Sequence, residues 1–432
     1  MINLIRTKIK SIQTNLKDFM HGKPFNREEK LKELGFLFDG PTDIIINEDS
    51  ISVSNPSCPD CESHNVVKDG KNSKKIPGTK KSINKQRYKC NNCKKKFTIK
   101  LKHTKKGDHH FTAIKAFAAF LRCASSKTSV SLRMVKTFLM EFFNYPFSHE
   151  SVRISISKFI PKAKEILSEI IGSGYYSYDE QWVKINGKWK FRQTLVDYQK
   201  SLILNEKIVD AVNEDTVLEF FVETLKASPI AAITTDGDNS YPWAIEKLEK
   251  ITGNQIKHQR CTFHSQKDLT KIINAFKKPA REKYKKLKCQ IRLMFSLDNP
   301  KTMEKCFQEL GEDVEVMVRN LLKKEEKIFT ARKIFDSIYI LRNNYPKPIV
   351  KYIEGVNAIW DNLTYFYSDP NISKTSNPNE NSYSYSSGTK RRFKTMKGLE
   401  GHFISRAFFK NNFKNGLNFD TIADNDSLLS MF

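Results

Sequence analysis

Two C-x-x-C pairs inside a lysine-rich segment constrain the fold of this chain more than any other feature. Cys58 and Cys61 form CPDC, Cys90 and Cys93 form CNNC, and 28 residues separate the two pairs. Each pair can present two sulfurs to one ion, so together they predict one tetrahedral four-cysteine Zn²⁺ site. Two disulfides or four unrelated thiols are the alternatives, and an intracellular chain argues against disulfides.

Positive charge is concentrated around the same cysteines. From Lys68 to Lys106 there are 16 basic residues and one acidic residue, so this stretch carries +15 of the formal net charge of +26. Such a field predicts a polyanionic partner, with nucleic acid favoured over an anionic membrane. The sequence has no apolar run of about 18 residues, which excludes a transmembrane helix. Charge interrupts MINLIRTKIK early, which argues against a secretory signal.

The first 108 residues are expected to form two segments. Residues 1–55 suggest a helical accessory segment without evident chemistry, and residues 56–108 suggest a zinc ribbon with short strands and a lysine-rich loop that tracks phosphates. The expected DNA contacts in the ribbon are Lys94, Lys95 and Lys96.

Residues 109–172 predict three amphipathic helices. Ser148 is a candidate N-cap of the third, which should kink or end near Pro161. The polar start of this helix, which includes Arg153, fits a helix–turn–helix that docks in the DNA major groove. Plain packing helices are the alternative.

Residues 173–265 predict the strand and helix order βββαβαβα. Asn186-Gly187 is a dipeptide preferred in type I′ hairpin turns, and it separates the first two strands. This order is that of a ribonuclease-H-like α/β core, in which the first and fourth strands are neighbours.

Three carboxylates occupy informative places around this core. Asp179 lies on the first strand, Asp236 ends the fourth, and Glu380 lies where a loop-like stretch gives way to a basic helix. Clustered carboxylates repel one another unless divalent cations neutralise them, so the set suggests a metal centre. As alternatives, Asp236-Gly237 could be an ordinary turn, and Asp238 or Glu180 could be the functional acids.

The motifs around these acids resemble those of DDE-type transposases, in particular Mutator-like and related prokaryotic insertion-sequence transposases. The resemblance rests on YDEQWVKINGKW, TTDGDNSYP, QRCTFHSQKDL and the stretch from Trp360 through TSNPNE. It implies that Asp179, Asp236 and Glu380 form a catalytic triad that binds two Mg²⁺ ions, for which Mn²⁺ can substitute. It also implies that Cys261 and His264 match the family's C-x-x-H signature.

The spacing of the acids requires an insertion within the core. Asp236 and Glu380 are 380 − 236 = 144 residues apart, far more than one strand and one helix need. Residues 266–365 predict an all-α insertion domain, residues 366–415 the last part of the core, and residues 416–432 a tail.

Three further sets of residues could contribute to the site or to DNA binding. Cys261 and His264 could ligate zinc, but support of the active site is favoured because two ligands are too few for a closed site. Trp360 could stack on an unpaired base or pack in a core. The basic residues after Glu380 that could contact DNA are Lys390, Arg391 and Arg392.

The expected function is that of a transposase of a DNA insertion element. It would bind terminal inverted repeats, cleave phosphodiester bonds and join 3′-hydroxyl ends to target DNA, as a homodimer in the cytoplasm of a prokaryote, associated with the nucleoid. A metal-dependent structure-specific nuclease on the same fold and a non-catalytic DNA-binding derivative are the alternatives.

Overall fold

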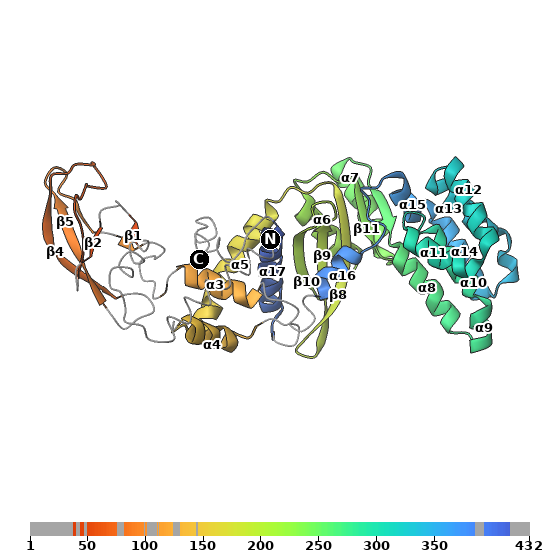
Figure 1. Cartoon of the computed structure of the whole chain (residues 1–432), viewed down its shortest axis with the longest axis horizontal. Coiled ribbons are helices and arrows are strands. Elements are labelled where there is room, and N and C mark those ends of the chain that lie inside the picture. The colour runs from red at the N-terminus through yellow and green to blue at the C-terminus, as the bar shows by residue number, and fades with distance from the viewer. Residues whose placement is uncertain are drawn as a thin grey trace.

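The structure of the chain is a computed structural model. It describes residues 38–39, 44–46, 50–75, 82–98, 100–101, 110, 112–123, 130–143, 146–384 and 393–414. A small β-rich part lies at one end of the molecule in Figure 1, a bundle of helices at the other, and a larger sheet between them. None of the described helices combines the length and the apolar character that a membrane crossing requires. The predicted accessory helix at the N-terminus lies outside the described residues.

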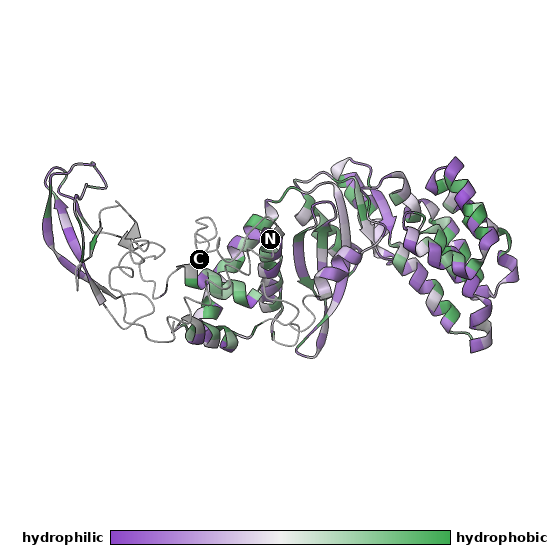
Figure 2. Cartoon of the chain, in the orientation of Figure 1, coloured by the Kyte–Doolittle hydropathy of each residue, from purple (hydrophilic) through white to green (hydrophobic). Residues whose placement is uncertain are grey.

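The cysteine-rich segment forms a small sheet. Its strand order is β2-β3-β5-β4, with β6 also paired to β5, and β1 pairs separately with β7. Purple dominates β4 and β5 in Figure 2, because these strands are rich in lysine. The bounds are β1 Phe38–Asp39, β2 Ile44–Ile46, β3 Ser50–Val53, β4 Val66–Lys75, β5 Ser82–Cys90, β6 Lys96–Thr98 and β7 Lys100–Leu101.

The prediction of a lysine-rich loop between the two cysteine pairs is wrong for most of its length. β4 and β5 are paired antiparallel from Val66↔Cys90 to Lys75↔Ser82, so the lysines lie on a long hairpin. Alternation along a strand lets every second side chain reach water, so a highly charged segment can pair without burying its charges.

Three helices follow, as the sequence predicts: α3 (Thr112–Cys123), α4 (Leu132–Phe143) and α5 (His149–Ser168). The Ser148 hydroxyl accepts a hydrogen bond from the backbone N–H of Ser151 at 3.0 Å, which confirms the N-cap. Helix α5 does not end near Pro161, which lies inside it, and the helix continues to Ser168. Phe159, two residues before Pro161, packs in a buried aromatic cluster with Phe408 and Phe409.

The central sheet has the order β10-β9-β8-β11-β12, with β8, β9 and β10 antiparallel and β8, β11 and β12 parallel. This confirms the predicted neighbourhood of the first and fourth strands. Positive φ angles of 48° at Asn186 and 80° at Gly187 confirm the predicted turn between β8 and β9. The bounds are β8 Tyr175–Ile185, β9 Lys188–Asp197, β10 Leu202–Val209, α6 Glu214–Leu225, β11 Ala232–Thr235, α7 Ser240–Thr252 and β12 Lys257–Arg260.

The two faces of this sheet are covered by different helices. Helices α6 and α7 pack against each other and enclose an apolar core with residues of β8 and β11 such as Tyr178 and Ile233. On the opposite face, α17 packs against β10 and α5.

The segment after β12 is helical as predicted. Its core is one large apolar cluster. Green and purple alternate along the ribbons of these helices in Figure 2, as expected for helices with one apolar face. The bounds are α8 Thr262–Asn274, α9 Lys278–Lys283, α10 Lys285–Met294, α11 Pro300–Leu310, α12 Glu312–Lys324, α13 Lys327–Ile340, η1 Arg342–Asn344, α14 Lys347–Ala358 and α15 Trp360–Ser368.

Two helices at the end of the described chain correct the prediction there. Glu380 lies in a short helix, α16 (Asn377–Ser384), in place of the expected loop. The basic stretch forms α17 (Met396–Lys414), which is buried along most of its length and includes the buried residues Leu399, Phe403 and Phe409. A helix that is buried on most sides belongs to a core, so α17 serves mainly to pack against the sheet and α5.

Candidate active site

Asp179 and Asp236 lie at the same level of neighbouring parallel strands. The register between β8 and β11 pairs Ser177 with Thr234. Two residues further along each strand, the chain reaches Asp179 and Asp236, and adjacent strands are only about 4.8 Å apart. The convergence that the sequence predicted for these two acids is therefore present in the fold.

The electrostatics at Asp179 agree with the nearby placement of Asp236. Burial of Asp179, followed by the nearby charges of Glu180 and Asp236, raises the pKa of the Asp179 carboxyl to about 8. A buried carboxylate next to other acids is destabilised by lost hydration and by repulsion, and a divalent cation relieves both. The donor set therefore fits a hard divalent cation such as Mg²⁺.

The two alternative acids have structural partners. Glu180 points to the opposite face of the sheet from Asp179, where it accepts hydrogen bonds from the hydroxyls of Tyr178, at 2.7 Å, and Tyr241. Asp238 accepts from the backbone N–H of Ser240 at 2.8 Å and from its hydroxyl, at the start of α7. Asp179 and Asp236 each accept a backbone N–H as well, from Glu180 at 2.8 Å and from Asp238 at 3.1 Å.

Helix α16 is attached to the sheet beside Asp179. The Tyr383 hydroxyl donates to the backbone carbonyl of Asp179 at 2.6 Å, and the Asn379 side-chain amide donates to the carbonyl of Thr194 at 2.8 Å. Ser376, Glu380 and Tyr383 are spaced i, i+4, i+7 and share one helix face.

Glu380 is exposed on that face. Among the described residues, a set of three or more metal-ligating side-chain atoms within 4.8 Å of one another is formed only by the four cysteines of the N-terminal segment. The structure thus places the helix of Glu380 at the site, without drawing the three carboxylates into one close cluster.

Cys261 and His264 link β12, α8 and α16. The Cys261 thiol is buried and accepts from the backbone N–H of Ser376 at 3.4 Å and from its hydroxyl at 3.5 Å. The adjacent Cys261, with further contributions from Asp236 and Asp179, raises the pKa of His264 to about 8. A cationic His264 next to two acids balances part of their charge. Since no third ligand lies close to this pair among the described residues, the pair fits support of the site better than zinc binding.

The four N-terminal cysteines form the metal-ligating cluster that their spacing predicts. The Sγ atoms of Cys58 and Cys93 are 3.4 Å apart and those of Cys61 and Cys90 are 3.6 Å apart. Tetrahedral Zn²⁺ with Zn–S bonds of about 2.3 Å requires sulfur separations near 3.8 Å, so the geometry suits zinc.

The two cysteine turns share a backbone feature. Glu62 and Lys94, each directly after the second cysteine of its pair, both adopt a positive φ angle (57° and 63°). The Cys93 backbone N–H is the main cause that lowers the pKa of Cys90 to about 7, and the pKa of Cys58 is lowered as well, whereas those of Cys61 and Cys93 are raised by the neighbouring sulfurs.

The basic residues expected to contact DNA have local partners. Lys95 pairs with Asp60 at 3.0 Å, Lys96 with Asp69 at 3.2 Å, and Lys94 donates to the backbone carbonyl of Asn91. Arg153 forms a salt bridge with Glu150 on the exposed start of α5. Exposed pairs of this kind contribute only about 0–1 kcal/mol, so a phosphate can replace the acid. Lys390, Arg391 and Arg392 lie outside the described residues.

Trp360 belongs to the core of the helical segment. It is 9% exposed, its ring centroid lies 5.1 Å from that of Phe335, and the Arg332 guanidinium lies 5.0 Å from it. The structure therefore supports the packing interpretation of Trp360.

Sequence reasoning missed the groups that hold the site together. Asn379, Tyr383 and Ser376 attach α16 to the sheet, and their i, i+3, i+7 spacing in TSNPNENSY is a helical signal that the abundance of Ser and Asn concealed. The buried ion pair of Arg192 with Glu206, under the ring of Phe403, carries no local sequence signal.

Comparisons with known proteins agree with this geometry. Residues 175–310 match a family model described as the DDE domain. The chain is also 26% identical over 360 residues to an uncharacterized 48.3 kDa protein of insertion element ISM1 from Methanobrevibacter smithii, and the match covers 80% of each chain. Together these matches confirm the resemblance to DDE-type transposases of insertion sequences.

The match to the DDE domain indicates a class of fold and a class of reaction. It implies a ribonuclease-H-like α/β core, polynucleotidyl-transferase-type activity on DNA and use of divalent metal ions. The match ends at residue 310, so it includes Asp179, Asp236, Cys261 and His264 and does not reach Glu380.

Proposed function

We propose that this protein is the transposase of a DNA insertion element and that Asp179, Asp236 and Glu380 are its catalytic acids. The observation that carries the proposal is the placement of Asp179 beside Asp236 on neighbouring strands, with the pKa of Asp179 raised by burial and like charge. Glu380 joins the proposal because α16 is attached directly to the backbone of Asp179.

The residues of the chain have distinct roles in this mechanism. Asp179 and Asp236 would bind Mg²⁺ from the sheet, and Glu380 would complete the set when DNA and metal are bound. Mg²⁺ held there would lower the charge of the reacting phosphate and promote attack, first by water and then by the freed 3′-hydroxyl. Cys261 and His264 would orient α16 and balance charge near the acids.

The other parts of the chain would bind DNA. The zinc ribbon at 56–108 and the three helices at 109–172 would recognise the terminal inverted repeats, with Lys94, Lys95, Lys96 and Arg153 on phosphates or in the groove. The insertion at 266–365 would divide the core into 173–265 and 366–415. Two copies would act together, because two DNA ends must be cut and joined.

The test is a strand-transfer assay with the purified full chain, labelled DNA that carries the sequences flanking the gene, a plasmid target and Mg²⁺. The wild type should cut the ends and join them to the plasmid. The variants Asp179→Asn, Asp236→Asn and Glu380→Gln should each bind DNA but lose activity about 1000-fold, which corresponds to about 4 kcal/mol of lost transition-state stabilisation.

Two matched variants control for charge and position. Asp238→Asn keeps a side-chain oxygen for the start of α7. Glu180→Gln keeps one oxygen that accepts from one tyrosine hydroxyl, and its NH2 group donates to the other hydroxyl, which can turn to accept. Both variants should therefore retain activity. Cutting without joining would favour a nuclease. DNA binding without any cutting by the wild type would favour a non-catalytic derivative.

A further inference from the structure

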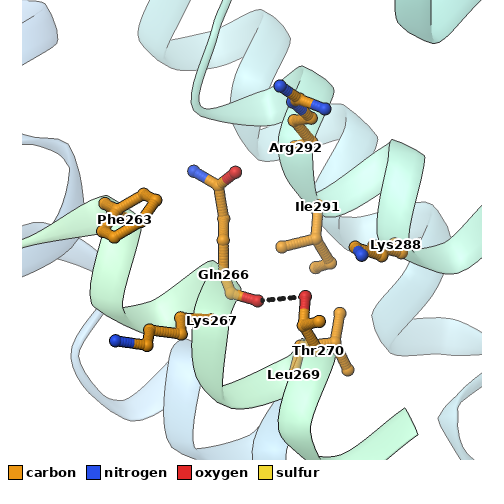
Figure 3. A pocket seen from close by; sticks show the side chains of 8 residues that line it. All are labelled: Phe263, Gln266, Lys267, Leu269, Thr270, Lys288, Ile291 and Arg292. Carbon is orange, nitrogen blue, oxygen red and sulfur yellow. Dashed lines mark hydrogen bonds between the residues drawn. The ribbon is translucent and has the colours of Figure 1, made fainter. Parts of the chain in front are cut away.

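A cavity between α8 and α10 lies next to the candidate active site. It has a volume of about 370 Å³, and its lining residues come from α8 and α10 alone. Phe263, at its rim, directly precedes His264 of the site, and the two rings lie 5.9 Å apart. Figure 3 shows the side chain of Gln266 between Phe263 on α8 and Arg292 on α10.

The floor of the cavity is apolar and its rim is cationic. Leu269 and Ile291 are fully buried beneath it. Phe263 is 44% exposed, so one aromatic ring borders an open apolar surface. The remaining lining residues include Lys267, Lys288 and Arg292.

The basic residues at the rim differ from other basic residues on the same two helices in their lack of acidic partners. Outside the cavity, Lys271 on α8 pairs with Asp268 at 2.8 Å, and Lys285 on α10 pairs with Glu309 at 2.7 Å. The three basic residues of the rim have no salt bridge with any acid in the described part of the chain. Unpaired cations gathered around an apolar, aromatic-edged cavity fit a ligand that combines an anion with a flat apolar group.

We infer that this cavity binds one nucleotide of an unpaired DNA strand that runs from the active site, an inference that rests on the proposed function. The base lies against Phe263 and the apolar floor, and the phosphates lie at Lys288, Arg292 and Lys267. Gln266 faces the base with an amide that can both donate and accept. The volume is that of a small-ligand pocket, which admits one nucleotide and excludes a duplex.

The phosphate part is tested by binding of fluorescein-labelled oligothymidine without metal, followed by anisotropy at several salt concentrations. The variant Lys288→Ala/Arg292→Ala should bind about tenfold more weakly, and the slope of log affinity against log salt should fall by about 1.4, or about 0.7 for each lost phosphate contact. The matched control Lys271→Ala/Lys285→Ala removes the same amount of charge, one lysine from α8 and one from α10, and should change affinity less than about twofold.

The base part is tested with Phe263→Ala and an abasic oligonucleotide of equal length. Loss of stacking should weaken oligothymidine binding about tenfold and leave abasic binding unchanged. The inference would be overturned if the cavity pair and the control pair lost the same amount of affinity for oligothymidine. It would also be overturned if Phe263→Ala weakened binding equally to oligothymidine and to the abasic oligonucleotide. A thermal melt of each variant confirms folding.

This test and the test of the proposed function can fail independently. The binding assay uses no metal and no cleavage, so a wild type that cuts nothing still reports on the cavity. If the wild type cuts and joins DNA but the cavity variants bind oligothymidine as tightly as the wild type, only the inference about the cavity is refuted.

Discussion

At the scale of single residues, the raised pKa of Asp179 governs how the site responds to pH. Burial, Glu180 and Asp236 together hold this carboxyl protonated up to about pH 8 in the metal-free protein. A divalent cation must displace that proton, so metal affinity should rise about tenfold per pH unit up to about pH 8 and then level off.

Calorimetric titration of Mn²⁺ into the full chain at a series of pH values measures this dependence. Asp179→Asn should remove most of it, since the residue that exchanges the proton is gone. An affinity of the wild type that does not change with pH would contradict the assignment of Asp179 as a metal ligand.

The same pKa shift predicts that the variant Asp179→Asn is more stable than the wild type. An acid whose folded-state pKa lies above its unfolded value of 3.8 loses stability as pH rises from about 4 to about 8, because the unfolded chain releases the proton first. Asp179→Asn removes that penalty, which is at most about 5 kcal/mol at pH 8. Thermal melts without metal should show a higher Tm for the variant at pH 8 and a smaller difference at pH 5.

At the scale of elements, α16 connects the third acid to the sheet through few contacts. Asn379 is buried and its amide donates to Thr194 of β9. Loss of the amide removes a buried hydrogen bond, at a net cost of about 0.5–1.5 kcal/mol.

We therefore expect Asn379→Ala to lower strand-transfer activity about tenfold or more while DNA binding stays as in the wild type. Asn377→Ala is the matched control, because Asn377 is exposed at the start of the same helix. Equal effects of the two substitutions in the strand-transfer assay would show that the anchor of Asn379 does not position the site.

At the scale of the whole molecule, the cysteine-rich sheet and the central sheet have separate sources of stability. In the described part of the first, few apolar side chains are buried and four thiols are clustered, whereas the second is enclosed by helices on both faces. Small modules of that kind depend on their metal for folding.

Zinc removal should therefore abolish the DNA binding of the N-terminal segment and leave the main thermal transition of the core within about 2 °C. Metal analysis should find about one zinc per chain, and Cys90→Ser should lose it while Cys289→Ser keeps it. Less than one zinc in the wild type, unchanged in Cys90→Ser, would rule out the four-cysteine site.

The sequence by itself determined the features that depend on local pattern. Alternating strand and helix periods predicted the order of the central sheet, Asn186-Gly187 predicted its first turn, and the cysteine spacing predicted the cluster of thiols. These features were readable because each depends on residues close together in the chain or on a periodicity of 2 or 3.6.

Only the tertiary structure decided which surfaces are buried and which groups meet. It placed α17 and Trp360 in cores, converted the lysine-rich stretch into a hairpin, and attached α16 to the backbone of Asp179. It also brought α8 and α10 together around a cationic cavity. Such outcomes depend on packing between elements far apart in sequence, where a buried contact outweighs local preference, so no short pattern of residues reveals them.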